Sequence, residues 1–143
     1  FVDTPAGASD ASIEFAAACD AVVVVLVPEP TSFMDAYAFI KALFVEKKVQ
    51  TVSIVVNMAK TEKAAANSFE SFKKIVTKFL DIEVDFAGWL PSTKDMASSV
   101  VARKPVVLQK NLDKGINKNF TEIAKSLVGL KPNKSKGVMF FNE

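Results

Sequence analysis

The residues best suited to chemistry open the chain, in the run Phe1-Val2-Asp3-Thr4-Pro5-Ala6-Gly7. Two apolar residues, an acid and then Pro and Gly predict the end of a buried strand followed by a turn. A carboxylate there lies where open α/β sheets bind ligands, and hard cations prefer oxygen ligands, so Asp3 could face a hydrated Mg²⁺ on a nucleotide. Gly7 would let the backbone approach a phosphate or bend sharply. The alternative is an ordinary turn that Asp3 merely caps.

Two more groups of polar residues stand where predicted strands end. Asn57 ends an apolar run, and its amide offers a donor and an acceptor that suit the edge of a purine base. The alternative is an Asn that ends the strand through its own local hydrogen bonds. The second group follows another apolar run and contains Glu29, Thr31, Ser32 and Asp35. The spacing of its Ser and Asp is close to a capping box, and an Asp in a first turn also suits the helix dipole.

The elements that must position these residues alternate between strand and helix. The runs 21–27 and 51–57 are apolar without alternation, which is typical of parallel strands covered on both faces, and a shorter strand at 86–90 stops at Pro91. Predicted helices cover 10–19 (capped by Ser9 or Asp10), 32–48, 62–80, 94–103 and about 116–128, with Gly129 as the last stop. This order predicts an α/β fold with helices on both faces of a parallel sheet. Right-handed crossovers would then place Asp3, residues 28–32, Asn57 and Pro91 at one edge.

Taken in order, DTPAG, Pro28-Glu29-Pro30-Thr31-Ser32, Asp35-Ala36-Tyr37 and Val55-Val56-Asn57 resemble the MinD/ParA family of P-loop ATPases. Within that family they look most like the FlhG branch, which controls flagellar number and placement. The resemblance runs to about residue 129 and begins at the family's switch II segment. It implies a partial doubly wound, mainly parallel sheet, with residues 1–129 as the C-terminal part of the ATPase domain and 130–143 as a tail.

The resemblance also implies roles for particular residues. Asp3 would hold the Mg²⁺ of ATP through water, and Gly7 would move toward the γ-phosphate. Asn57 would contact adenine, while Pro91 and the backbone of Ser92 would form the other wall of the base pocket. The nucleotide-dependent dimer interface would lie near Glu29, Thr31, Ser32 and Asp35.

The sequence departs from the family in two respects. Thr93 stands two positions after Pro91, where the family often has an acidic residue, so a direct role for an acid is in doubt although Thr93 can still cap a helix. The phosphate-binding pattern G-x-x-x-x-G-K-[ST] and the family's lysine-rich variant of it are also absent. We therefore expect a partial chain without the N-terminal half and its central strand, inactive by itself, whose sheet has an unpaired apolar edge.

The amino-acid composition excludes several classes of function for this sequence. Half of the 143 residues are hydrophobic, 24% are charged, and the apolar runs are too short to span a bilayer. Histidine is absent, which excludes Ser-His and Cys-His catalysis within this sequence, and the one cysteine, Cys19, excludes an internal disulfide. No signal peptide is recognisable at Phe1 to Gly7, and we expect a reducing, cytoplasmic setting.

Charge is unevenly distributed along the chain. Residues 1–93 have 8 Lys/Arg against 12 Asp/Glu, whereas residues 94–143 have 10 against 4. A basic C-terminal third could favour an anionic membrane or nucleic acid, or could simply be solvated lysines on surface helices. In the tail, Lys131, Lys134 and Lys136 precede Val138-Met139-Phe140-Phe141, which suits a membrane anchor or an apolar cluster that packs on the domain.

The function expected from the resemblance is an ATP-dependent homodimer that switches with slow hydrolysis, cycles on and off the inner membrane and contacts flagellar assembly or regulatory proteins. Two alternatives remain open at this point. One is a chromosome- or plasmid-partition ATPase that binds DNA non-specifically. The other is a non-catalytic α/β binding module.

Overall fold

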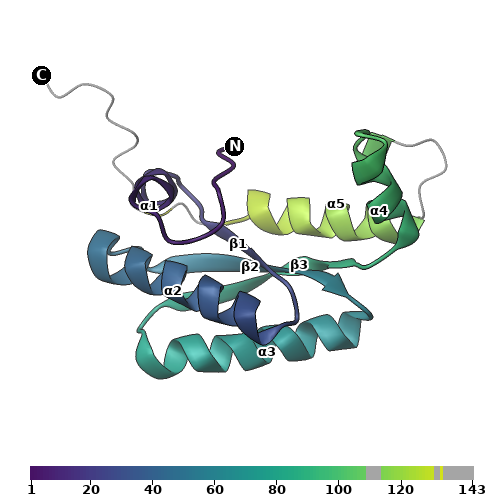
Figure 1. Ribbon diagram of the computed structural model, residues 1–143. Helices are drawn as coiled ribbons and strands as arrows, with labels where there is room; N and C mark the ends of the chain where they lie inside the picture. Colours follow the sequence, from purple (N-terminus) through teal and green to yellow (C-terminus); the bar gives the residue numbers. More distant parts are fainter. Residues whose placement is uncertain (109–113, 131–132, 134–143) are drawn as a thin grey trace, which may run out of the picture.

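The chain folds into a three-stranded sheet with helices on both sides (Figure 1). The structure, a computed structural model, describes residues 1–108, 114–130 and 133, and Lys114 by its backbone alone. The strands are β1 (Val23–Leu26), β2 (Thr51–Ala59) and β3 (Glu83–Pro91). The helices are α1 (Asp10–Ala17), α2 (Pro30–Lys47), α3 (Glu62–Phe79), α4 (Lys94–Val101) and α5 (Lys114–Val128), and a 3₁₀ turn, η1, spans Val106–Leu108.

The sheet is parallel throughout and its strands follow chain order, β1-β2-β3. Val24 pairs with Ile54 and Val52 with Val84, so β2 is the central strand. Helices α2 and α3 cover one face of the sheet, and α5 lies on the other against β3 (Figure 1). The predicted α/β fold with a parallel sheet and helices on both faces is confirmed.

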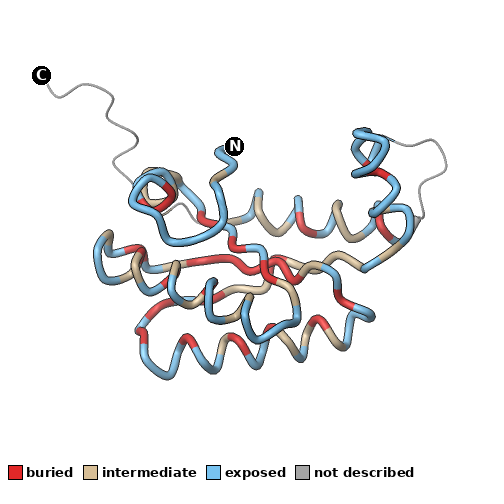
Figure 2. The backbone as a smooth tube through the Cα atoms, viewed as in Figure 1, coloured by how far each residue is buried: buried red, intermediate tan, exposed pale blue. Residues whose placement is uncertain are grey.

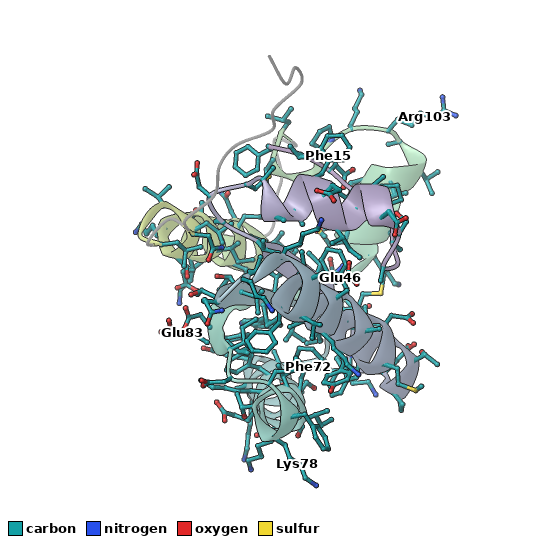
Figure 3. All side chains as sticks on the ribbon, turned by 90° about the vertical axis from the view of Figure 1, so that its left-hand side faces the viewer. Phe15, Glu46, Phe72, Lys78, Glu83 and Arg103 are labelled. Atoms are coloured by element: carbon teal, nitrogen blue, oxygen red, sulfur yellow. The ribbon has the colours of Figure 1, made fainter. Side chains whose placement is uncertain are left out.

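The core explains why the central run lacks alternation. Val52, Ile54 and Val56 pack toward α2 and α3, while Val55 packs with Ala87 against α5, so β2 is buried on both faces (Figure 2). The largest buried side chain is Phe72 of α3, whose ring meets that of Phe33 edge-on at a centroid distance of 5.3 Å. It points inward, whereas Lys78 on the same helix extends into solvent (Figure 3).

Several boundaries differ from the predicted ones by a few residues. Strand β3 begins at Glu83 and includes Pro91, which is possible because this strand is at an edge of the sheet and Pro91 is its last residue. Strand β2 continues past Asn57 to Ala59. Helix α2 begins at Pro30 rather than at residue 32, since proline suits the first helical position.

The prediction that Phe1 and Val2 end a buried strand is wrong for this structure. Residues 1–9 form neither helix nor strand, and both apolar side chains are exposed. The physical reason lies at β1, which is an edge strand: among the described residues only β2 pairs with it. Val23 and Val25 on this strand remain 38% and 59% exposed, so the expected apolar edge is present.

Candidate functional site

A cavity of about 390 Å³ lies between the first residues of the chain, the open strand β1 and the start of α2. Its polar lining includes Asp3, Gly7, Ser32 and Asp35, and Val23 and Val25 contribute apolar walls. The structure thus brings together four of the residues predicted for the metal, phosphate and dimer-interface roles. They come from two segments that are about 30 residues apart in sequence.

The turn that carries Asp3 is attached to α1. The hydroxyl of Ser12, which is buried, donates to the carbonyl oxygen of Pro5 at 3.4 Å and contacts the hydroxyl of Ser9 at 2.9 Å. Ser9 also caps α1, as predicted, by accepting from the Ser12 N–H. Gly7 has φ +97°, which side chains rarely tolerate, and a Cβ there would meet no atom within 4 Å. Conformation, rather than a lack of space, therefore requires glycine at this position.

The start of α2 is built differently from the predicted capping box. Its N-cap is Glu29, whose side chain makes no capping hydrogen bond. Ser32 instead turns back, and its hydroxyl oxygen accepts from the Val27 N–H at 3.0 Å. Because the helix begins at Pro30, Asp35 is its sixth residue, beyond the first turn. Both the capping-box and the helix-dipole interpretations are therefore wrong, and the exposed Asp35 carboxylate lines the cavity.

A second cluster forms where β2 and β3 end. Ala59 pairs with Pro91, and the Ser92 N–H donates to the Ala59 carbonyl oxygen at 3.3 Å. The side-chain oxygen of Asn57 accepts from the Met58 N–H at 2.8 Å, which is the local bond that the alternative interpretation expected. That bond uses one acceptor, and the Asn57 amide NH₂ has no partner among the described residues.

The bend after Asn57 could not be predicted from the sequence. Met58 adopts φ +56°, an uncommon conformation for a side chain other than Gly, Asn or Asp. The pairing register between β2 and β3 shifts between Val56 and Ala59, so the chain bulges at this point. Leu26 pairs with Val56, which places the 28–32 segment next to the bulge at the carboxyl end of the sheet.

The family model named ParA, described as NUBPL iron-transfer P-loop NTPase, matches residues 1–128. The chain belongs to the ParA family of P-loop NTPases. It is also similar to antiactivator FleN of Pseudomonas aeruginosa, with 32% identity over 105 residues. That alignment covers 73% of this chain but only 38% of FleN, so the chain spans about two fifths of the relative's length.

Membership of the ParA family makes the parallel sheet part of a P-loop NTPase fold. Thr93 caps α4 by accepting from the Met96 N–H at 3.2 Å, so the loss of the family's usual acid leaves this helix start intact. Within the described residues, no three His, Cys, Asp or Glu side chains gather closely enough to ligate a metal ion directly. Nor does any described helix have the length and apolar character needed to cross a membrane.

Proposed function

We propose that this chain is part of an ATPase whose Mg·ATP site includes the cavity at β1. The observation that carries the proposal is the convergence of Asp3, Gly7, Ser32 and Asp35 on that cavity, in a chain that matches the ParA family over residues 1–128. The open edge of β1 forms one wall of the cavity. It is where a central strand carrying the phosphate loop would add in a longer protein, as expected from the resemblance.

Each residue has a part in this proposal that follows from its chemistry. The exposed Asp3 carboxylate would hold Mg²⁺ through water, because hard cations prefer oxygen ligands. Gly7, which has φ +97° and open space where a Cβ would stand, would approach the γ-phosphate through its backbone. The NH₂ of Asn57, which has no partner within the part of the chain that the structure describes, would donate to the adenine ring, with Pro91 and Ser92 as the opposite wall. When bound, the metal neutralises phosphate charge, which is the main need in phosphoryl transfer.

The cellular role proposed is control of flagellar number or placement by a nucleotide-dependent homodimer. Its support is the similarity to FleN, whose name describes an antiactivator. Glu29, Thr31 and Asp35 are exposed at the start of α2, beside the candidate site, and are available for a dimer contact. We propose flagellar assembly or regulatory proteins as partners, and a cytoplasmic location with peripheral contact at the inner membrane.

Hydrolysis is tested in the longest natural form of the protein. Asp3→Ala should abolish Mg²⁺-dependent phosphate release, a loss of orders of magnitude, because electrostatic stabilisation dominates such reactions. Asp81→Ala is the matched control: Asp81 is exposed between α3 and β3, at the opposite edge of the sheet, and the control should keep normal turnover. Unchanged ATPase activity in Asp3→Ala, with a normal circular dichroism spectrum, would refute the assignment of Asp3 to the Mg²⁺ site.

The flagellar and partition roles separate in the cell. Deleting the gene should change the number or position of flagella and leave plasmid and chromosome inheritance intact. Loss of inheritance with normal flagella, together with non-specific DNA binding in vitro, would support a partition ATPase instead.

The predicted membrane tail begins at Leu130, and residues 131–132 and 134–143 lie outside the described part of the chain. Co-sedimentation with anionic liposomes should fall when the protein ends at Gly129. Equal binding by the truncated and full-length forms would exclude the tail as an anchor.

A further inference from the structure

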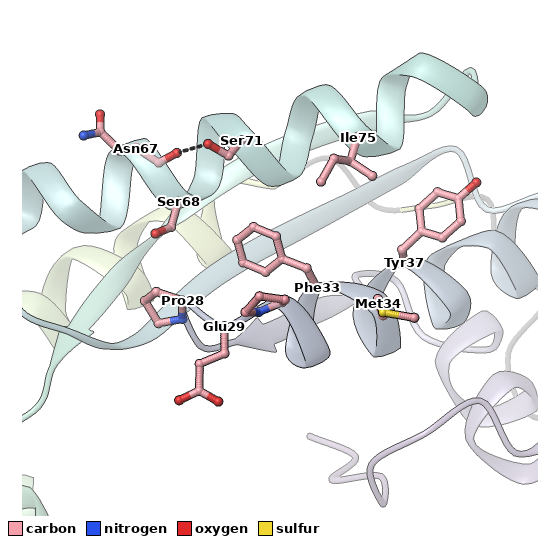
Figure 4. A pocket seen from close by; sticks show the side chains of 10 residues that line it. Pro28, Glu29, Phe33, Met34, Tyr37, Asn67, Ser68, Ser71 and Ile75 are labelled. Carbon is pink, nitrogen blue, oxygen red and sulfur yellow. Dashed lines mark hydrogen bonds between the residues drawn. The ribbon is translucent and has the colours of Figure 1, made fainter.

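A groove of about 590 Å³ lies between α2 and α3 (Figure 4). It lies on the other side of α2 from the Asp3 cavity. Apolar side chains dominate the lining and come mainly from α2 and the segment before it: Pro28, Pro30, Phe33, Met34, Tyr37 and Ile75. We call this surface the α2–α3 groove. Of the residues proposed for Mg²⁺, adenine and dimer contacts, Glu29 alone lines this groove, so its apolar composition needs a separate explanation.

Core packing does not explain the rim of the α2–α3 groove. Met34 is 71% exposed and Ile75 is 44% exposed, although both project from helices that already bury an apolar face on the sheet. Phe79, one turn beyond Ile75, is 65% exposed and meets Tyr37 edge-on at a centroid distance of 6.5 Å. Flexible methionines and exposed aromatics in one concave place are typical of surfaces that bind another molecule.

Ring contacts fix two of the aromatic side chains that line the groove. Phe33 is held by the buried ring of Phe72, and Tyr37 is held by Phe79. On the α3 side the wall is low, because small residues, Ser68 and Ser71, stand there. The Ser71 hydroxyl donates to the carbonyl oxygen of Asn67 in its own helix at 2.8 Å, so its proton is already used within α3. A channel between two parallel helix surfaces, with apolar anchor sites and a low wall, is the shape that receives an amphipathic helix.

Charge indicates what kind of helix fits. Exposed lysines surround the Tyr37 and Ile75 end: Lys41 is one turn after Tyr37, Lys74 adjoins Ile75, and the Lys78 ammonium lies 5.3 Å from the Phe79 ring centroid. At the other end the lining contains one acid, Glu29. The tail 130–143 is a poor match, since it carries three lysines against one glutamate.

We infer that the α2–α3 groove docks an amphipathic helix of a partner protein. Its apolar anchors would recur at i, i+3 or i+4, and i+7, and its acidic side chains would lie at the end that meets Tyr37 and Ile75. This inference is independent of ATP hydrolysis, because the groove shares no residue with the proposed metal site.

The test uses a library of displayed 14-residue helical peptides, selected for binding to the longest natural form of the protein. Selected peptides should show the i, i+3/i+4, i+7 apolar spacing and a net negative charge. Their affinity should fall at least tenfold for Met34→Glu and for Ile75→Glu, because central apolar anchors dominate such interfaces. Val45→Glu is the matched control, since Val45 is an exposed apolar residue of α2 that does not line the groove, and it should bind normally.

A charge exchange sharpens the result. Lys74→Glu combined with Lys78→Glu should weaken the acidic peptides about tenfold at low salt, and peptides whose acids are changed to lysine should recover that loss. Three outcomes would overturn the inference. The first is a set of selected peptides that are basic or lack the apolar spacing. The second is peptide binding that Met34→Glu and Ile75→Glu leave unchanged. The third is a protein that binds no peptide but binds phosphatidylglycerol vesicles, and loses vesicle binding in the same two variants.

Discussion

The contact between α5 and β3 depends on one glycine, and replacing it should destabilise the fold. Gly88 has φ +142°, and a Cβ at this position would lie 2.6 Å from Cγ1 of Ile123 in α5. Gly88→Ala therefore incurs two costs. Holding alanine in that conformation costs about 1–3 kcal/mol, and overpacking against a buried side chain costs about 1–3 kcal/mol. The expected loss of about 2–6 kcal/mol is large beside a typical total stability of about 5–15 kcal/mol.

Urea denaturation followed by circular dichroism measures this loss. Gly129→Ala is the control, because Gly129 has an ordinary φ and its nearest atoms would lie at 3.6 Å, so its free energy of unfolding should change by less than about 0.5 kcal/mol. Adding Ile123→Ala to Gly88→Ala removes the clashing atom. The double variant should then be more stable than the sum of the single effects predicts, by about 1–3 kcal/mol. If Gly88→Ala behaves like Gly129→Ala, α5 is not seated on β3 as described.

Three further predictions concern a cap, an ion pair and the sheet edge. Thr93→Ala should lower the free energy of unfolding by about 1 kcal/mol while Thr93→Ser preserves it, because only the hydroxyl caps α4; equal loss in both would contradict this. The hydrogen bond that the Lys47 ammonium donates to the Glu14 carboxylate raises the pKa of Lys47 above its ordinary 10.5. The pair therefore stabilises the fold fully below pH 10.5 and less as pH rises through the folded pKa. Melting temperatures between about pH 9 and pH 12 should therefore fall less steeply in Glu14→Gln, and an unchanged slope would show that the pair is not formed. The 143-residue chain alone should aggregate, and Val25→Lys should raise its solubility because Val25 is exposed at the sheet edge. By calorimetry the same chain should bind Mg·ATP only in the millimolar range or weaker. Micromolar ATP binding would refute the expectation that the chain needs a separate phosphate loop.

Sequence patterns were sufficient for the elements whose burial is decided locally. The apolar run at 51–57 predicted a strand covered on both faces, and β2 is central and packs against α2, α3 and α5. The three- and four-residue spacing of Ala65, Phe69, Phe72 and Val76 likewise predicted α3, where all four are buried. The strand predicted before Asp3 was wrong, because a strand needs a partner and β1 pairs only with β2 among the described residues.

The candidate site was predicted in part. The carboxyl-edge rule predicted the position of Ser32 after β1, since this depends on topology. Asp3 reaches the same cavity through a turn, because no strand precedes it in the structure. The hydroxyl of Ser32 could not be assigned, because the same residue type caps a helix or bonds backward to Val27 depending on where the helix starts. The α2–α3 groove was not predicted at all. Periodicity shows which side of a helix is apolar, but not whether a neighbouring helix covers it.

The consecutive strand order has a consequence for how the chain is made. Each strand hydrogen-bonds to the one before it in sequence, β1 to β2 and β2 to β3, so the sheet grows at one edge as the polypeptide lengthens. None of these three strands pairs with a strand two crossovers away, which keeps the sequence separation of their contacts low for a parallel sheet. A ribosome could therefore release β1, α2 and β2 as a nucleus to which α3 and β3 add in turn. Synthesis in this order would make β3 the last of the three strands to join, so the contact of α5 with β3 would form after the rest of the sheet.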